Sequence, residues 1–288
     1  MLSQEQVSAY HRDGFLKVGG LFSDDEVAEL ESEMRWIVDE WWGEDSIGWR
    51  GPWRDHYLPP GEQKNTKAVF ISNPQYYSAV WGHIIFHPGL IGALQSLIGE
   101  NIVWHHTILH GKPPERGTPF PMHQDYPFYP HDGPNFVDCL LHLDHTPIDS
   151  GCLRAVPGSH QAGPLERITG DHTRPYLPPN TYYPDLLPAK AIPATAKDMI
   201  FFSYYNTIHW SDVNQTDQWR KSVRIGFHAP EMRPIGIDQR TLNNRLVVAG
   251  VKPHDQEPKL TYRYTKKPPV KRSPDRVAIR ELGYKPPA

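Results

Sequence analysis

Fold and function are best inferred from the stretch Met122-His123-Gln124-Asp125-Tyr126, taken together with His209 and Arg220 farther along the chain. Two imidazoles and one carboxylate form the facial triad, which holds non-haem Fe(II) and leaves positions open for oxygen chemistry. A Gly- and Pro-rich segment, 111–117, precedes the pair, so we expect it at a strand end or rim loop facing a cavity. His123, Asp125 and His209 are therefore the predicted catalytic metal ligands of an oxygen-activating enzyme.

The spacing His-x-Asp is not decisive alone, because it occurs three times in this chain. The copy at 11–13 lies just before a capping-type helix start, and we expect it at the surface. The copy at 142–144 lies in an apolar run of strand length, which leaves it as an alternative metal pair.

The order of the predicted elements indicates a mainly β fold with N-terminal helices, a double-stranded β-helix or jelly roll of the cupin type. We expect a single domain over 1–288, with a helical part at 1–100, a jelly-roll core at 101–230 and a C-terminal extension at 231–288 that has little regular structure. The basic, Pro-rich residues 252–288 are interpreted as a solvated tail, with an extended arm or an oligomer contact as the alternative. Helical periodicity covers 3–12, 24–41 and 88–98, and strand patterns cover 102–109, 136–143, 152–156, 189–192, 198–202 and 223–228.

Composition excludes several classes of protein. The 288 residues can bury a substantial core, and a net charge of −3 argues against general affinity for nucleic acid. No apolar run is long enough to span a bilayer, and no signal-peptide pattern is seen at the N-terminus. Cys139 and Cys152 do not make a disulfide framework, and the last residues are not a Ser-Lys-Leu peroxisomal address. We expect a cytoplasmic enzyme with a small-molecule substrate; the oligomeric state stays open.

Several motifs together resemble the phytanoyl-CoA dioxygenase family of Fe(II)/2-oxoglutarate-dependent oxygenases. The resemblance spans roughly residues 5–230 and includes the spacing from the distal histidine to the arginine. The matching residues are Lys112-Pro113-Pro114, His123-Gln124-Asp125, Gly151-Cys152-Leu153-Arg154-Ala155-Val156-Pro157-Gly158-Ser159-His160, His209 and Arg220.

The resemblance implies Fe(II), 2-oxoglutarate and O2 as cofactor and cosubstrates, with ascorbate as an optional reductant. Arg220 would bind the far carboxylate of 2-oxoglutarate through its planar guanidinium. Ser211 matches a family position that contacts the cosubstrate, or else it is a turn hydroxyl. Ile108 and Leu140 lie where the family places a methionine and a tryptophan against 2-oxoglutarate, and both depart from those residue types.

Strand alternation extends these predictions to the substrate. If Ile108 points inward, then Trp104 and His106 share its face and line the pocket, although core packing explains Trp104 equally well. Arg224 shares the face of Arg220, and a lone buried cation is costly. We therefore expect Arg224 to bind an anionic group of the substrate or to pair with an internal acid such as Asp138.

The implied reaction is the hydroxylation of an unactivated C–H bond of a small organic metabolite, with release of succinate and CO2. Asp125 favours hydroxylation over halogenation, because halogenating relatives place a small residue there. Desaturation, epoxidation, cyclisation or endoperoxide formation are alternatives that use the same ligands. The other hypotheses are a non-redox metal-dependent cupin, acting as an isomerase or hydrolase, and a metal-free binding protein, neither of which needs Arg220.

Overall fold

The computed structural model describes residues 1–42, 69–114, 119–165, 188–203, 207–235 and 246–250. The helices are α1 Gln4–Asp13, α2 Asp24–Ile37, α4 Val80–Ile84 and α5 Pro88–Ile98, with a π-helical turn Val38–Trp42 and short 3-10 turns Pro74–Tyr76, Tyr126–Phe128 and Ser159–Ala162. The strands are β1 Phe15–Val18, β2 Val69–Ser72, β3 Ile102–Lys112, β4 Phe120–His123, β5 Phe136–His142, β6 Leu153–Ala155, β7 Lys190–Ile192, β8 Met199–Ser203, β9 His209–Ser211, β10 Arg220–His228 and β11 Leu246–Ala249.

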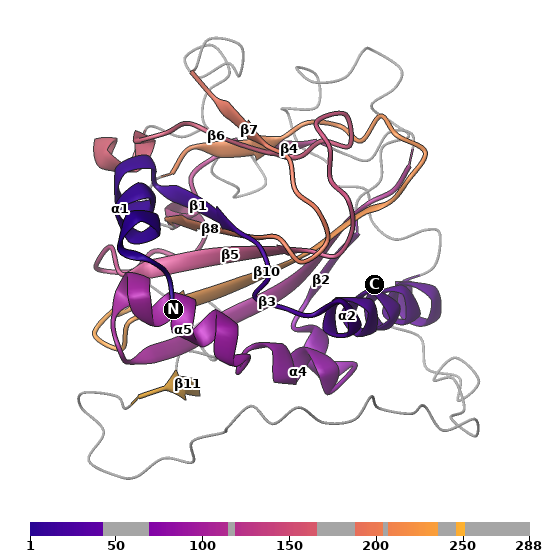
Figure 1. Cartoon of the computed structure of the whole chain (residues 1–288), viewed down its shortest axis with the longest axis horizontal. Helices are drawn as coiled ribbons and strands as arrows, with labels where there is room; N and C mark the ends of the chain where they lie inside the picture. Colours follow the sequence, from indigo (N-terminus) through magenta and orange to yellow (C-terminus); the bar gives the residue numbers. More distant parts are fainter. Residues whose placement is uncertain (43–68, 115–118, 166–187, 204–206, 236–245, 251–288) are drawn as a thin grey trace.

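The strands form two antiparallel sheets that face each other (Figure 1). The main sheet has seven strands in the order β1-β8-β5-β10-β3-β11, with β2 also paired to β3. The small sheet has four strands in the order β4-β9-β6-β7. Helices α2, α4 and α5 lie along the face of the main sheet that is turned away from the small sheet (Figure 1). This is the predicted jelly roll with N-terminal helices.

The helices begin where the sequence supplies caps. Ser3 and Gln6 form a capping box at α1, and Ser23 and Glu26 form the same box at α2. His87 caps α5 with its ring, and a proline follows at the first helical position. The helices predicted at 3–12, 24–41 and 88–98 are confirmed, with α2 passing into the π-helical turn at Val38.

The alternation of side chains on β5 and β10 separates the helix side of the main sheet from the interior. Val137, Cys139 and Leu141 of β5 join the large core packed under the helices, and so do Val223, Ile225 and Phe227 of β10. Leu140 points the other way and packs with Leu153 and Phe202 between the two sheets. The polar residues of β10, starting at Arg220, therefore face the interior of the jelly roll.

Several short strands were not predicted from the sequence. β4 and β9 have four and three residues, and neither shows a periodicity long enough to predict a strand. The expectation of little regular structure after residue 231 is wrong at Leu246–Ala249, because β11 pairs with β3 there. The main sheet thus takes strands from all three predicted segments of the chain, and their division at 100 and 230 stays a prediction. The segment 252–288 lies outside the described residues.

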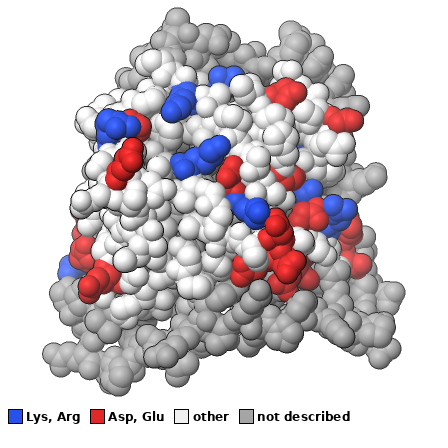
Figure 2. Space-filling model, viewed as in Figure 1, with Lys and Arg blue, Asp and Glu red and all other residues white. Residues whose placement is uncertain are grey.

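Lysine, arginine and acidic side chains are interspersed on the face shown in Figure 2. None of the described helices combines the length and apolar character that crossing a membrane requires.

Candidate active site

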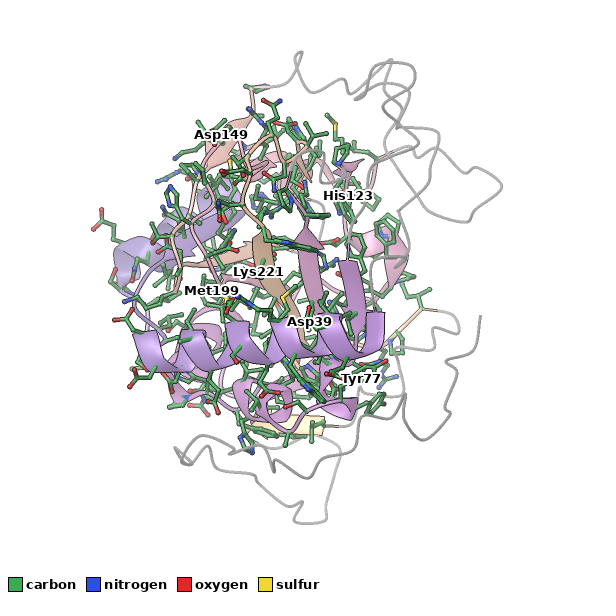
Figure 3. All side chains as sticks on the ribbon, turned by 90° about the vertical axis from the view of Figure 1, so that its right-hand side faces the viewer. Asp39, Tyr77, His123, Asp149, Met199 and Lys221 are labelled. Atoms are coloured by element: carbon green, nitrogen blue, oxygen red, sulfur yellow. The ribbon has the colours of Figure 1, made fainter. Side chains whose placement is uncertain are left out.

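Two histidines come together because β4 pairs with β9 in the small sheet. His123 is the last residue of β4, His209 is the first of β9, and the two are direct partners in the antiparallel register. Asp125 follows in the turn that leads into Tyr126–Phe128. In Figure 3, His123 lies on the side of the main sheet away from α2. The predicted strand-end position of the His-Gln-Asp motif is therefore confirmed.

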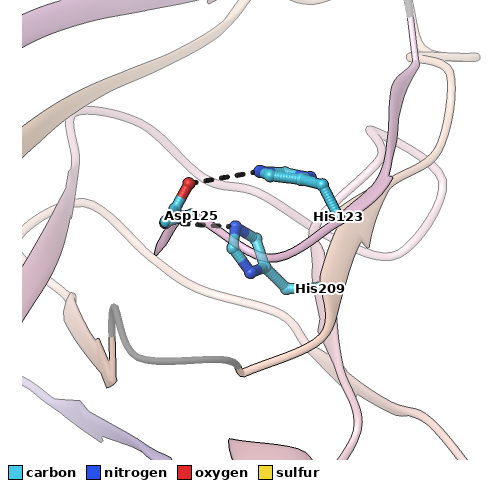
Figure 4. Close-up of side chains that lie close together, drawn as sticks. All are labelled: His123, Asp125 and His209. Carbon is cyan, nitrogen blue, oxygen red and sulfur yellow. Dashed lines mark ion pairs between the residues drawn. The ribbon is translucent and has the colours of Figure 1, made fainter. Parts of the chain in front are cut away.

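His123, Asp125 and His209 converge on one point (Figure 4). His123 Nε2 lies 3.3 Å from Asp125 Oδ1, and His209 Nε2 lies 3.5 Å from Asp125 Oδ2. One ligand atom from each residue falls within 4.8 Å of the other two, and all three side chains are buried. Among the described residues no second such group of histidine, cysteine and carboxylate ligands occurs, so the alternative pairs at 11–13 and 142–144 lack a third ligand.

The protonation states of His209 and Asp125 suit a divalent cation. Burial lowers the pKa of His209 to about 4, so its imidazole is neutral near pH 7. Its Nδ1 lies 2.9 Å from the Thr207 carbonyl, which makes Nδ1 the donor and leaves the Nε2 lone pair directed at Asp125. Burial works to raise the pKa of Asp125, but Arg224 and His209 outweigh it and hold the pKa well below its usual range.

The surroundings of the Asp125 carboxylate also suit a bound cation. Within the described part of the chain, both of its carboxylate oxygens are buried without a hydrogen bond, and the groups at ion-pair distance from them are the two imidazoles and the Arg224 guanidinium. A buried ionised carboxylate is costly unless it is paired or binds a metal. The donor set, two imidazoles and one carboxylate, fits a non-haem ferrous ion.

A cavity begins beside His123 and His209 and continues between the two sheets. Its walls near the histidines are apolar and aromatic, whereas its far end carries cations and hydroxyls. The residues that line it are Phe70, His110, Gly111, Lys112, Phe120, His123, Leu140, Leu153, Phe202, His209, Trp210, Ser211, Arg220, Ser222 and Arg224.

Two buried cations meet at the far end of this cavity. Arg220 and Lys112 are direct partners in the β10–β3 register and are only 6% and 7% exposed. Lys112 Nζ donates to the Ser211 hydroxyl at 2.8 Å and to the Asp212 carbonyl. Arg220 Nε and the Ser222 hydroxyl have no hydrogen-bond partner among the described residues. Burial lowers the pKa of both cations, and Arg220 lowers that of Lys112 further, so this end of the cavity favours an anion.

The loop from His209 to Arg220 is held in place by local features of the sequence. The Asn214 side-chain amide donates to the carbonyls of Pro113 at 3.0 Å and Gln218 at 2.7 Å. Gly151 adopts φ 72°, and a Cβ there would collide with the Asp212 carbonyl, which explains a glycine at this turn. The chain therefore leaves the metal ligands, turns, and returns on β10 with Arg220 pointing inward.

The predicted cosubstrate contacts lie on or near the cavity. Ser211 and Leu140 line it, with Ser211 held by Lys112. Ile108 is half-buried on β3 opposite Arg224 in the register, and it is not part of the cavity wall. The sequence identifies Lys112 only as part of a family motif. A single lysine before two prolines does not indicate that its side chain is buried in a cavity.

A β-bulge corrects one strand-parity prediction. The register of β3 with β10 shifts between Gly226 and Phe227, so that His105 is an extra residue and Trp104 turns to the opposite face from His106. Trp104 packs in the core under the helices, with its indole nitrogen 3.1 Å from the Thr107 hydroxyl. The shared face predicted for Trp104 and His106 is therefore wrong, and core packing accounts for Trp104.

Arg224 pairs internally, as one of the two hypotheses for it states. Its Nε lies 3.2 Å from Asp138 Oδ1, and a second nitrogen lies 2.8 Å from Asp125 Oδ1. His106 Nε2 approaches Asp138 Oδ1 from another side, at 3.4 Å. The second contact of Arg224, to a candidate metal ligand, was not anticipated from the sequence.

Comparison with known proteins agrees with this site. The family profile described as phytanoyl-CoA dioxygenase (PhyH) matches residues 10–222. The chain belongs to the phytanoyl-CoA dioxygenase family. A probable alpha-ketoglutarate-dependent hypophosphite dioxygenase of Stutzerimonas stutzeri is 27% identical over 80% of this chain and 80% of its own length. The peroxisomal phytanoyl-CoA dioxygenase of Rattus norvegicus is 26% identical over 85% of this chain and 73% of its own.

A solved structure shares the fold of this family member. The epimerase SnoN, solved in complex with Fe3+, alpha ketoglutarate and nogalamycin RO, superposes with a TM-score of 0.66. It is 21% identical and the match covers 92% of this chain and 95% of the SnoN chain. The jelly-roll fold expected from the sequence is thereby confirmed.

Proposed function

We infer that this protein is an Fe(II)- and 2-oxoglutarate-dependent dioxygenase that acts on a small organic molecule. The observation that carries this conclusion is the placement of two sites in one cavity. A facial group of two histidines and a carboxylate lies at one end, and the buried cation pair of Arg220 and Lys112 lies at the other. A metal ligand set joined to an anion site suits a keto-diacid that chelates the metal and needs a cation for its far carboxylate.

His123, Asp125 and His209 would hold the iron. When bound, iron with 2-oxoglutarate and O2 supplies the oxidising power, and 2-oxoglutarate is converted to succinate and CO2. The protein's contribution to the metal is to orient its ligands: the Thr207 carbonyl fixes the ring of His209 through Nδ1, and burial keeps that imidazole neutral.

Arg220 would bind the far carboxylate of 2-oxoglutarate through two parallel N–H groups. Its guanidinium is buried, its Nε has no other hydrogen-bond partner among the described residues, and it faces the cavity. Ser222 offers a hydroxyl from the same strand face, and Lys112 adds positive charge while its hydrogen bond orients Ser211. The cosubstrate's negative charge in turn stabilises two cations that repel each other.

The apolar wall would keep water from the reacting centre. Phe120, Leu140 and Phe202 line the cavity between the metal ligands and the cation pair. In such surroundings the charge-assisted bonds to the cosubstrate are stronger than in water.

Hydroxylation of an unactivated C–H bond is the outcome that we propose. Asp125 fills the third metal-ligand position with a carboxylate and so supports hydroxylation. Arg224 lines the cavity beside Asp125, whereas His106 is buried against Asp138 and is not among the described residues that line the cavity. The two relatives are named for hypophosphite and for phytanoyl-CoA, which are chemically unrelated, so the family membership does not choose the substrate.

The test is a screen for substrate-dependent succinate release. Protein loaded anaerobically with Fe(II) is given 2-oxoglutarate, O2, ascorbate and a metabolite library, and hydroxylated products are identified by mass spectrometry. We expect a compound that gives succinate and an oxygenated product in equal amounts. His209→Ala is the matched control, because it removes one metal ligand and should abolish both products. Succinate formation that His209→Ala leaves intact would contradict the proposal.

A non-redox cupin is the alternative function, and the structure does not favour it. Isomerases and hydrolases of this fold can use the same three ligands but need no remote anion clamp. The pairing of Arg220 with Lys112 at the end of the same cavity has no role in such an enzyme.

A further inference from the structure

The ion pair between Arg224 and Asp125 suggests a role for Arg224 in metal coordination. We propose that Arg224 is a positioning residue that holds one carboxylate oxygen of Asp125, so that Asp125 offers only its other oxygen to the metal. The proposal rests on the proposed function, because it requires a metal at this site. It concerns a residue that neither substrate nor cosubstrate needs to touch.

The contacts of Arg224 define which oxygen it holds. Its Nη2 lies 2.8 Å from Asp125 Oδ1, and this is an ion pair rather than an aligned hydrogen bond. Oδ1 is also the oxygen near His123 Nε2, at 3.3 Å, whereas Oδ2 faces His209 Nε2 at 3.5 Å. The guanidinium therefore covers Oδ1 and leaves Oδ2 to a cation between the two imidazoles.

Arg224 is itself fixed from the opposite side. Asp138, which is fully buried on β5, accepts from Arg224 Nε at 3.2 Å and from Nη2 at 3.3 Å. The Tyr129 hydroxyl donates to Asp138 at 2.6 Å and also contacts Arg224 Nη2. A guanidinium held by three groups resists displacement, because moving it would take an arginine cation away from the buried carboxylate of Asp138.

Glycine on β10 makes this arrangement possible. Gly226 lies opposite Asp138 in the register of β10 and β5. A Cβ on Gly226 would collide with the His106 ring and press on Asp138 Oδ1 at 3.2 Å. The missing side chain thus leaves room for His106 and Asp138 to meet at 3.4 Å, which fixes Asp138 and, through it, Arg224.

The charges in this cluster explain why an arginine is tolerated beside a metal ligand. Two buried carboxylates, Asp125 and Asp138, share one guanidinium, so the three groups together carry a net negative charge. That charge attracts a divalent cation even though Arg224 repels it. Replacing Arg224 by a neutral residue should therefore not weaken the attraction for the metal.

The consequence concerns the open positions on the metal. A carboxylate can bind a metal through one oxygen or through both. Binding through both oxygens would occupy a position that the facial triad leaves for the cosubstrate. By holding Oδ1, Arg224 keeps that position available for the chelating keto-acid.

The test measures metal and keto-acid binding separately by calorimetry, with Mn(II) as the metal and pyruvate as a keto-acid that lacks a far carboxylate. We expect Arg224→Met to bind Mn(II) at least as tightly as wild type and to bind pyruvate, once loaded with Mn(II), about tenfold more weakly. Arg224→Lys should restore pyruvate binding in part, because an ammonium group can still contact Oδ1. Arg220→Met is the matched control and should leave pyruvate binding unchanged.

Two outcomes would overturn the proposal. One is unchanged pyruvate binding in Arg224→Met, and the other is loss of Mn(II) binding in both Arg224→Met and the double variant Arg224→Met/Asp138→Asn. The double variant removes the Arg224 guanidinium together with the Asp138 carboxylate that it neutralises. It is therefore expected to fold even where the single variant does not. Failure of the wild-type protein to bind Mn(II), or to bind 2-oxoglutarate once loaded with Mn(II), would instead refute the proposed function, because neither binding event requires Arg224.

Discussion

Replacing Arg220 by methionine should separate recognition of the far carboxylate from chelation of the metal. Methionine keeps much of the length and apolar character of the arginine stem but removes the guanidinium. Arg220 is 6% exposed, and its Nε has no competing partner among the described residues, so the carboxylate would lose a desolvated ionic partner. The change should therefore weaken binding of 2-oxoglutarate and spare binding of pyruvate.

The expected magnitude follows from the number of contacts and from Lys112. Each hydrogen bond to a charged group contributes roughly 1.5–3 kcal/mol, and truncating one partner of a buried charge pair costs roughly 2–5 kcal/mol. Lys112 lies directly opposite Arg220 in the register and remains as a cation, which places the loss near the lower half of that range. We expect about 3 kcal/mol, or a dissociation constant roughly 150-fold higher for 2-oxoglutarate.

The assay is calorimetric titration of Mn(II)-loaded protein with 2-oxoglutarate and, separately, with pyruvate. Mn(II) avoids oxidation during the measurement, and the ratio of the two affinities isolates the far carboxylate. Equal losses of affinity for pyruvate and for 2-oxoglutarate in Arg220→Met would refute the assignment of Arg220 to the far carboxylate. Unchanged affinity for both keto-acids would refute the same assignment, because Arg220 would then not contact the cosubstrate.

Three further variants test other parts of the structure. Lys112→Met should weaken binding of 2-oxoglutarate about tenfold with little effect on pyruvate, measured in the same titrations, because it removes the second cation of the anion site. Gly226→Ala should lower the free energy of unfolding by about 2 kcal/mol in urea titrations, since its methyl group would collide with the His106 ring; an unchanged midpoint would contradict this packing. Burial raises the pKa of Asp144 from 3.8 to about 6, so the fold favours the protonated acid and stability should fall as pH rises from about 4 to about 6. Asp144→Asn should remove about 3 kcal/mol of that change in the free energy of unfolding between these pH values. If the free energy of unfolding of the two proteins varied with pH in parallel, Asp144 would not be the group responsible.

The helices and strands that could be predicted from the sequence are those whose ends and burial are determined by their own residues. Helix α5 begins at Pro88 and ends at Ile98 as predicted, because a proline at its first position and a glycine after its end delimit an apolar stretch. Strand β5 was found because it is a continuous buried run. β4 and β9 were missed because each has only a few residues and gains its order from pairing with the other.

The same distinction separates the site residues that could be predicted from those that could not. His123, Asp125 and His209 could be named from residue type and family spacing, and the structure brings them together. Trp104 was misplaced because strand alternation assumes a regular register, and a one-residue bulge reverses the face of every residue before it. The contact of Arg224 with Asp125 depends on a turn and a strand from distant parts of the chain, which no local pattern records.

The most direct test of the account is an anaerobic titration of the metal-free protein with Fe(II) and 2-oxoglutarate, followed by visible absorption. We expect one iron per chain and a weak charge-transfer band that appears only when Fe(II) and 2-oxoglutarate are both present. The band should be absent from His209→Ala and should need much more 2-oxoglutarate in Arg220→Met. A wild-type protein that shows no such band and retains zinc tightly would contradict the assignment as an oxygenase.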